Sequence, residues 1–243
     1  MPMQIWSLNL KKCWASKLCL FAVICVFVCS GKTLNASVPP VEVIKSDLKK
    51  RSFVKAASKT RGDFARMLGD WEASYGPDAV EPLLKIAFDV KVADSERYIA
   101  LMGASKLGGS LPSINSRVLP LLKDRSWMIR SGILRVLSAL NDPSAAKSVL
   151  PLLKDPALVV RVEAVNTIVK LKPKGASDAL LAVLEDKSNY SRGKPLWVPK
   201  WAIAGLVQLK ARSAAPKLSA LMKNMEEGEL KSQAALALES FKN

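Results

Sequence analysis

Histidine is absent from the 243-residue sequence, and all four cysteines lie near its beginning, between Cys13 and Cys29. The chain therefore lacks the side chain that most often acts as a general base near neutral pH and as a metal ligand. No second cluster of Cys or His follows Cys13, Cys19, Cys25 and Cys29, so none fits a zinc-binding spacing. We also find no glycine-rich phosphate loop. These absences predict a non-enzymatic protein without a metal or another cofactor.

Acidic residues are scarce: 21 Asp and Glu stand against 37 Lys and Arg, which gives a formal charge of +16. Such an excess suggests an anionic partner, such as nucleic acid, lipid headgroups, a cell-wall polymer or an acidic protein. The simpler interpretation is a lysine-rich surface that only keeps the protein soluble. Hydrophobic residues make up 49% of the chain, which is enough for a sizeable core.

A typical membrane-spanning helix needs about 20 apolar residues, and the apolar run at residues 18–29 has 12. Three lysines and no acid precede this run. The arrangement is typical of a secretory signal peptide, which we place at residues 1–36. Cleavage could follow Ser30 or Ala36, and we favour Ala36. We therefore expect an exported protein that is periplasmic or associated with the envelope.

Two other fates of this segment are open, namely lipidation at Cys29 and retention as an uncleaved anchor. Val28 stands where bacterial lipoprotein signals carry a small residue, so the lipoprotein pattern matches poorly. Cleavage after Ala36 would remove four lysines and no acid, and would lower the formal charge from +16 to +12. The remaining chain would have no cysteine, so packing rather than disulfide bonds must stabilise it.

Residues 37–77 are interpreted as a linker followed by an N-terminal helical cap. Pro39–Pro40 predicts an extended segment from Ser37 to Ile44. A basic helix is expected over residues 49–61, and Gly76–Pro77 ends the region. We expect this region to cap a repeat stack, because terminal units need a different outer face. The basic helix is either a solvated face or a contact for an acidic surface or membrane headgroups.

An internal repeat organises the rest of the chain. LPLLKDRSWMIR at residues 119–130 recurs as LPLLKDPALVVR at residues 150–161. A third copy of the first half ends at Asp186, which follows Asp155 at the same shift that separates Asp155 from Asp124. Repeats of this length predict stacked helix pairs, because each pair has an apolar stripe too wide to bury alone. Asp155 and its following proline are expected to start a helix, with Asp as the N-cap.

We expect about five helix pairs and no strand. The pairs are predicted at residues 78–107, 113–140, 142–171, 174–210 and 213–242. The fold class is therefore an all-α, right-handed α-solenoid over residues 78–243, preceded by the helical cap.

Two sets of repeated residues carry a resemblance to HEAT repeats. They are Pro120, Asp124, Ile129 and Arg130, and Pro151, Asp155, Val160 and Arg161. They are most similar to the short bacterial type of phycobilin lyase-like proteins. In that family, an Asp in the turn and an Arg that opens the second helix form a structural ladder along the stack. The resemblance implies this ladder for Asp124, Arg130, Asp155 and Arg161.

The period fails once, between Asp186 and Pro199, where the unit is seven residues longer than its neighbours. Solenoids often place function in such insertions. The insertion at 187–198 and the helix after it interleave basic and aromatic residues, which suit an anionic ligand with a flat or sugar face. The candidate partner-binding residues are Tyr190, Arg192, Lys194, Trp197, Lys200 and Trp201. The alternative is a variable loop whose Trp197 and Trp201 pack onto the stack.

The resemblance implies a scaffold or adaptor that binds a protein partner, since HEAT arrays are mostly interaction modules. Second helices usually line the concave face of such arrays, where the contacts would be Arg135, Asn166 and Lys170. The alternative function is binding of an anionic polymer or lipid headgroups, which salt would weaken. Nucleic-acid binding is less expected because the signal peptide directs the chain out of the cytoplasm.

Overall fold

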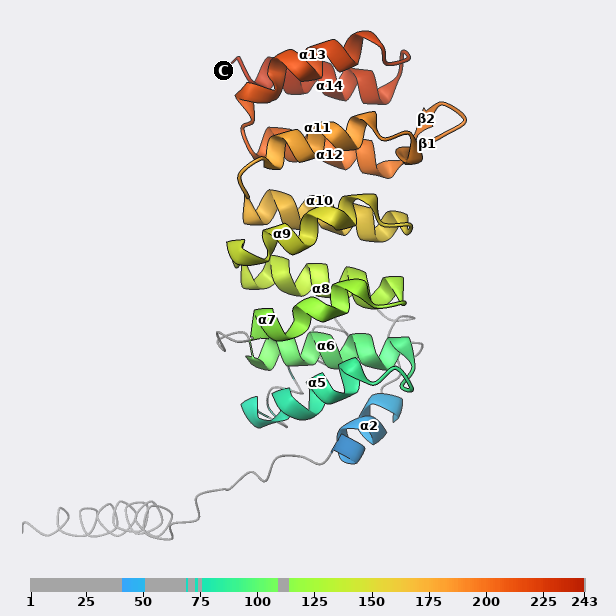
Figure 1. Ribbon diagram of the computed structural model, residues 1–243, viewed down its shortest axis with the longest axis vertical. Helices are drawn as coiled ribbons and strands as arrows, with labels where there is room; N and C mark the ends of the chain where they lie inside the picture. The colour runs from blue at the N-terminus through green and yellow to red at the C-terminus, as the bar shows by residue number, and fades with distance from the viewer. Residues whose placement is uncertain (1–40, 51–68, 70–72, 74–75, 109–113, 243) are drawn as a thin grey trace, which may run out of the picture. The chain divides into compact units, whose positions relative to one another are not determined.

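The computed structural model describes residues 41–50, 69, 73, 76–108 and 114–242, all within one unit that spans residues 38–243. The expected signal peptide and most of the expected basic helix at 49–61 lie outside the described residues. The described part begins with helix α2 (Val41–Lys50) and continues as a stack of helix pairs (Figure 1).

Each pair consists of a first helix and a second helix, and the two sets form two layers along the stack (Figure 1). The first helices are α5 (Val80–Phe88), α7 (Ile114–Val118), α9 (Ala146–Val149), α11 (Ala176–Glu185) and α13 (Ala215–Lys223). The second helices are α6 (Asp94–Gly108), α8 (Trp127–Leu140), α10 (Leu158–Leu171), α12 (Trp197–Gln208) and α14 (Glu229–Ser240). All five expected pairs are present, so the predicted all-α solenoid is confirmed.

A proline shortens two of the first helices. Pro120 and Pro151 stand in the repeated sequence LPLLK, where the chain tightens into the 3₁₀ helices η2 (Leu119–Lys123) and η4 (Leu150–Lys154). Proline has no N–H to donate and its ring clashes with the preceding turn, so a regular α-helix does not continue through it. The fourth unit has no proline at this place, and α11 runs unbroken for 10 residues.

Apolar residues at helical spacing fill the space between the layers. Ile129, Ile133 and Leu137 of α8 have no exposed surface. Their equivalents in the next unit, Val160, Ala164 and Ile168 of α10, have none either. Complete burial of one large aliphatic side chain contributes roughly 1.5–3 kcal/mol. Each unit obtains this burial from its neighbours, which is why the units are stable only as a stack.

Two glycines permit close approaches along the second helices. A methyl group on Gly132 of α8 would lie 2.9 Å from the ring of Tyr98 in α6. A methyl group on Gly205 of α12 would lie 2.7 Å from Val169 Cγ2 in α10. Both distances are shorter than a van der Waals contact, so the neighbouring side chains or their helices would have to move to accept alanine at either place.

Helix α2 differs from the extended segment that we predict for residues 37–44. The helix begins at Val41, and it contacts α5 and α6. Ile44 and Leu48 are completely buried, and Val41 packs against the same core. The prediction is wrong from Val41 onward because apolar residues three and four positions apart form a stripe that the first pair can bury.

The prediction that no segment forms a strand is wrong at one place. β1 (Tyr190–Ser191) and β2 (Lys194–Pro195) form an antiparallel hairpin inside the insertion. Its turn residues, Arg192 and Gly193, have φ values of 50° and 79°, as a type I′ hairpin turn requires. The hairpin projects from the edge where first helices turn into second helices (Figure 1). After it, α12 begins at Trp197, two residues before the expected start.

Candidate functional site

The first four turns between first and second helices share an aspartate. Asp89, Asp124, Asp155 and Asp186 each accept a hydrogen bond from the backbone N–H two residues further on, at 2.8–3.0 Å. The side chain thereby replaces a backbone acceptor and fixes a tight turn. The sequence predicts Asp155 as the N-cap of α10, but α10 begins only at Leu158. Asp155 therefore stabilises the turn instead of capping the helix.

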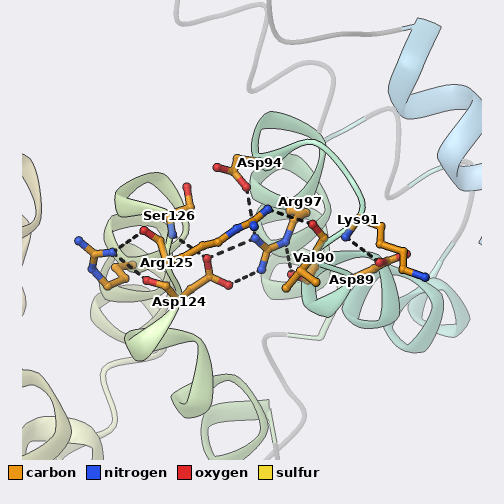
Figure 2. A network of polar contacts seen from close by, with 10 residues as sticks. Asp89, Val90, Lys91, Asp94, Arg97, Asp124, Arg125 and Ser126 are labelled. Carbon is orange, nitrogen blue, oxygen red and sulfur yellow. Dashed lines mark hydrogen bonds and ion pairs between the residues drawn. The ribbon is translucent and has the colours of Figure 1, made fainter.

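The aspartate of the second unit also binds an arginine of the first unit. Arg97 in α6 is completely buried and donates two hydrogen bonds to the carboxylate of Asp124 (Figure 2). It also donates to the carbonyl oxygen of Ala87 at 2.9 Å and to Asp94 at 3.3 Å. Burial alone would raise the pKa of Asp124, but the hydrogen bonds from Arg97 and the Ser126 N–H hold it below its usual range. The pair therefore stays charged inside the protein.

Arg130 in α8 repeats this arrangement one unit later. Its guanidinium donates to both carboxylate oxygens of Asp155, at 2.7 and 2.8 Å. These hydrogen bonds raise the pKa of Arg130. A further bond of 2.7 Å reaches the backbone carbonyl of Asp124. Within one unit, Arg130 therefore binds the backbone carbonyl of Asp124 and not its carboxylate. The ion pairs, Arg97–Asp124 and Arg130–Asp155, join consecutive units.

Arg161 departs from the predicted ladder. Its Nη1 donates to the carbonyl and hydroxyl oxygens of Ser188 and, at 2.6 Å, to Oδ1 of Asn189. The carboxylate of Asp186 instead accepts from Ser188, and these hydrogen bonds lower its pKa. Arg161 binds these neutral oxygens instead of the carboxylate of Asp186 because the insertion begins here and brings Ser188 and Asn189 to the guanidinium.

Lysines supply the connections at the two ends of the stack. Lys45 in α2 lies 3.5 Å from the carboxylate of Asp89. Lys200 in α12 binds Glu229 at the start of α14. We call this series of contacts, from Lys45 to Glu229, the interunit ladder. Its residues face one another between units, so the arrangement is structural.

Asn189 anchors the base of the insertion. Its side chain is completely buried, accepts a hydrogen bond from Arg161 and donates to the carbonyl oxygen of Val183 at 3.0 Å. Its own carbonyl accepts from the Leu196 N–H at 2.9 Å, which joins the two ends of the hairpin. The sequence does not single out Asn189, because a single asparagine in a polar loop has no distinguishing pattern.

Two of the six candidate residues in this region have structural partners. Tyr190 is half-buried, donates its hydroxyl hydrogen to the carbonyl of Leu184 at 2.7 Å, and burial raises its pKa. Lys200 belongs to the interunit ladder through Glu229. Neither side chain is available to a partner without giving up a contact in the stack.

The other four candidates are exposed. Arg192 and Lys194 lie at the tip of the hairpin. Trp197 is 75% exposed, and Trp201, one helical turn later, is 42% exposed. Trp197 therefore does not pack onto the stack as the alternative expects, whereas Trp201 is partly covered by it. The structure brings an aromatic pair and a basic hairpin to neighbouring places without forming an enclosed pocket from them.

Two adjoining grooves lie on the second-helix face. The first has a volume of about 610 Å³ and is lined in part by Asn166, Lys170 and Gln208. The second, of about 480 Å³, lies between α12 and α14 and is lined in part by Val207, Gln208 and Leu236. Gln208 borders both grooves. Leu236 is 66% exposed, so the second groove offers an open apolar contact.

The three residues predicted for the second-helix face have different environments. Asn166 and Lys170 line the first groove. Arg135 donates to Glu163 at 2.6 and 2.8 Å and to the hydroxyl oxygen of Tyr98 at 3.3 Å. It therefore connects α6, α8 and α10 and is less free to contact a partner.

The described part of the chain contains no cluster of acids that could hold a metal ion. It also contains no helix that is long and apolar enough to cross a membrane.

Comparisons with known proteins agree with this architecture. The family model of HEAT repeats matches residues 115–194. A designed armadillo repeat protein in complex with the peptide (KR)4 has a TM-score of 0.53 and 21% identity, over 85% of this chain and 96% of that chain. An engineered protein has a TM-score of 0.44 and 17% identity, over 84% of this chain and 85% of that chain. No curated protein matches.

The protein is thus an α-solenoid of stacked helix pairs, the class that includes the armadillo repeat protein. Its central units, residues 115–194, match the family model of HEAT repeats.

Proposed function

We propose that the protein is a non-enzymatic scaffold or adaptor that binds a protein partner through the exposed face of its second helices. The adjoining grooves that share Gln208 carry this proposal. Together they extend over α8, α10, α12 and α14. Packed helices lie about 8–10 Å apart, so this face spans roughly 25–30 Å, or about eight residues of an extended peptide.

The lining residues indicate what kind of segment would fit. Asn166 offers both a donor and an acceptor, which suits the backbone of an extended peptide. Lys170 favours a carboxylate at the first groove, and Val207 and Leu236 favour an apolar side chain at the second. The designed armadillo neighbour is in complex with the basic peptide (KR)4. For this chain, the lysine predicts an acidic segment instead.

We also propose that the protein is exported to the bacterial envelope. The support is the apolar run at residues 18–29, which follows three lysines and is short for a spanning helix. Sequencing the N-terminus of the protein recovered from the envelope fraction tests this proposal. A start at Ser37 is expected, and a chain that keeps residue 1 and remains in the cytosolic fraction would contradict it.

A photocrosslinking amino acid at Gln208 tests the binding face. The matched control carries the same crosslinker at Lys147, an exposed position on the first helix α9. We expect discrete protein adducts from Gln208 alone in envelope extracts, at low and at moderate salt. Replacing Leu236 with Asp should abolish them, because it places a charge in the apolar groove. Equal adducts from both crosslinkers would contradict the proposal.

A further inference from the structure

Large apolar side chains are exposed at the N-terminal ends of three consecutive second helices. Trp127 begins α8, and 48% of its surface is exposed. Leu158 and Val159 begin α10, and their exposed fractions are 37% and 46%. Trp197 and Trp201 follow in α12. We call these five residues the apolar edge.

The repeat places the apolar edge in one row. Trp127 and Leu158 occupy equivalent positions of consecutive units, and so do Val159 and Trp197 once the longer unit is taken into account. Helix α10 packs between α8 and α12. The axes of packed helices lie about 8–10 Å apart, so the five side chains follow one another along the side from which the hairpin projects.

Basic residues accompany this row in the same turns. The exposed ones are Lys123, Arg125, Lys154, Lys187, Arg192 and Lys194. The carboxylates of these turns are largely engaged: Asp124 and Asp155 bind arginines of the interunit ladder, and Glu185 lies 3.0 Å from Lys217. Acidic residues flank this stretch: Asp94 and Glu96 lie in the first turn of α6, and Glu226, in the turn before α14, lies beside Gly193 of the hairpin. From α8 to α12, the edge therefore combines apolar side chains with excess positive charge.

We propose that the apolar edge binds the surface of an anionic phospholipid membrane. Tryptophan is favoured at the level of the lipid headgroups, and neighbouring lysines and arginines are attracted by anionic lipids. Leu158 and Val159 would enter the boundary between headgroups and acyl chains, as apolar side chains of interfacial proteins do.

Three other occupants fit the edge less well. A peptide needs a groove, and none of the five residues lines either of the two grooves on the second-helix face. A second copy of the same edge would place like charges opposite one another. A carbohydrate would stack on Trp197 and Trp201 but would gain little from Leu158 and Val159. A membrane surface matches both the row of projecting side chains and their charge.

The proposed protein-binding grooves have no residue in common with the apolar edge, so the two surfaces can be tested separately. The inference does not depend on that function: crosslinks at Gln208 report on the grooves, and the experiment below reports on the edge.

The test uses the full chain labelled with 5-fluorotryptophan, with the fluorine resonances assigned by single Trp→Phe substitutions. Two kinds of vesicle are compared, and both carry a spin-labelled lipid. The anionic vesicles consist of equal parts phosphatidylglycerol and phosphatidylcholine, and the neutral vesicles consist of phosphatidylcholine alone. We expect the anionic vesicles to broaden the resonances of Trp127, Trp197 and Trp201, and the neutral vesicles to broaden them much less. The readout is specific to these sites whether or not residues 18–29 also hold the chain to the vesicle.

A triple variant, Lys123→Gln, Lys154→Gln and Lys187→Gln, removes charge beside the row. Each basic residue near an anionic surface contributes roughly a fivefold gain in affinity. The lipid concentration for half-maximal broadening should therefore rise at least about tenfold. The matched control, Lys172→Gln, Lys174→Gln and Lys210→Gln, removes the same charge from the turns after α10 and α12 and should change it far less.

Several outcomes would overturn the proposal. They are the absence of broadening at the three edge tryptophans, equal broadening by neutral vesicles, and equal effects of the two triple variants. A synthetic peptide of alternating Glu and Leu provides a further arm. If it shifts the three resonances while the vesicles do not, the edge binds an acidic protein, and the membrane proposal is wrong.

Discussion

Replacing Arg97 with methionine should destabilise the protein by about 3–5 kcal/mol, the range for breaking a buried ion pair. Arg97 has no exposed surface, and the side chain of Asp124 is only 6% exposed. The substitution leaves that carboxylate buried without its cation, and it also removes the donor to the carbonyl of Ala87. The loss is large against the total stability of about 5–15 kcal/mol for a typical domain. Urea unfolding followed by circular dichroism at neutral pH measures it.

The control is Arg117→Met at the same interface. Arg117 also makes two bonds to one carboxylate, that of Glu81, but these side chains are 38% and 59% exposed. Exposed pairs contribute about 0–1 kcal/mol, so this variant should unfold nearly as the parent does. Similar losses in both variants, or a loss below about 1 kcal/mol for Arg97→Met, would refute the argument that burial sets the energy.

Three further changes test other parts of the fold. Arg97 lowers the pKa of Asp124 below its ordinary value of 3.8. The ion pair therefore stabilises the folded protein above about pH 4, and this contribution is lost as the pH falls through the lowered pKa. Asp124→Asn should therefore flatten the fall in melting temperature on acidification, and an unchanged acid profile would contradict this. Asn189→Ala should cost about 1–3 kcal/mol, because buried polar partners lose their bonds, and should speed tryptic cleavage in the hairpin; unaltered cleavage would count against the anchoring role. Gly205→Ala should cost about 1–3 kcal/mol through overpacking against Val169, and a melt equal to the parent's would disprove the close approach.

The helix pairs could be predicted because their signal is local and repeated. The sequence LPLLKD recurs at one fixed shift, and the apolar residues around it return at helical spacing. The hairpin could not be predicted in this way. Its strands have two residues each, too few for an alternating pattern, and its turn depends on positive φ values at Arg192 and Gly193. The start of α2 was obscured by the neighbouring prolines, since its stability comes from burial against α5 and α6.

The charged residues of the turns were visible in the sequence, but their pairing was not. An offset of six links Asp124 to Arg130 along the chain, whereas the carboxylate of Asp124 binds Arg97, 27 residues earlier. Only the stacking distance between units selects that partner. The repeat itself marks Arg97 as a member of the series, because it precedes Arg130 by about one repeat and fills the same place in its unit. The apolar edge was harder to see, because sequence alone does not show which apolar residues remain exposed.

The interunit ladder has a direction, since each cation belongs to one unit and its acceptor to the next. Such a repeated head-to-tail contact is the kind that builds polymers, because each free end can bind the complementary end of a further copy. At the first end, Lys45 occupies the acceptor Asp89. Beyond the last contact of the ladder, Lys200–Glu229, the next cation along the stack is Lys231 of α14, which pairs with Glu227 four residues before it. Within the described residues, Asp89 and Lys231 therefore each have a partner in the same chain, and a second copy could join the ladder there only by displacing that partner.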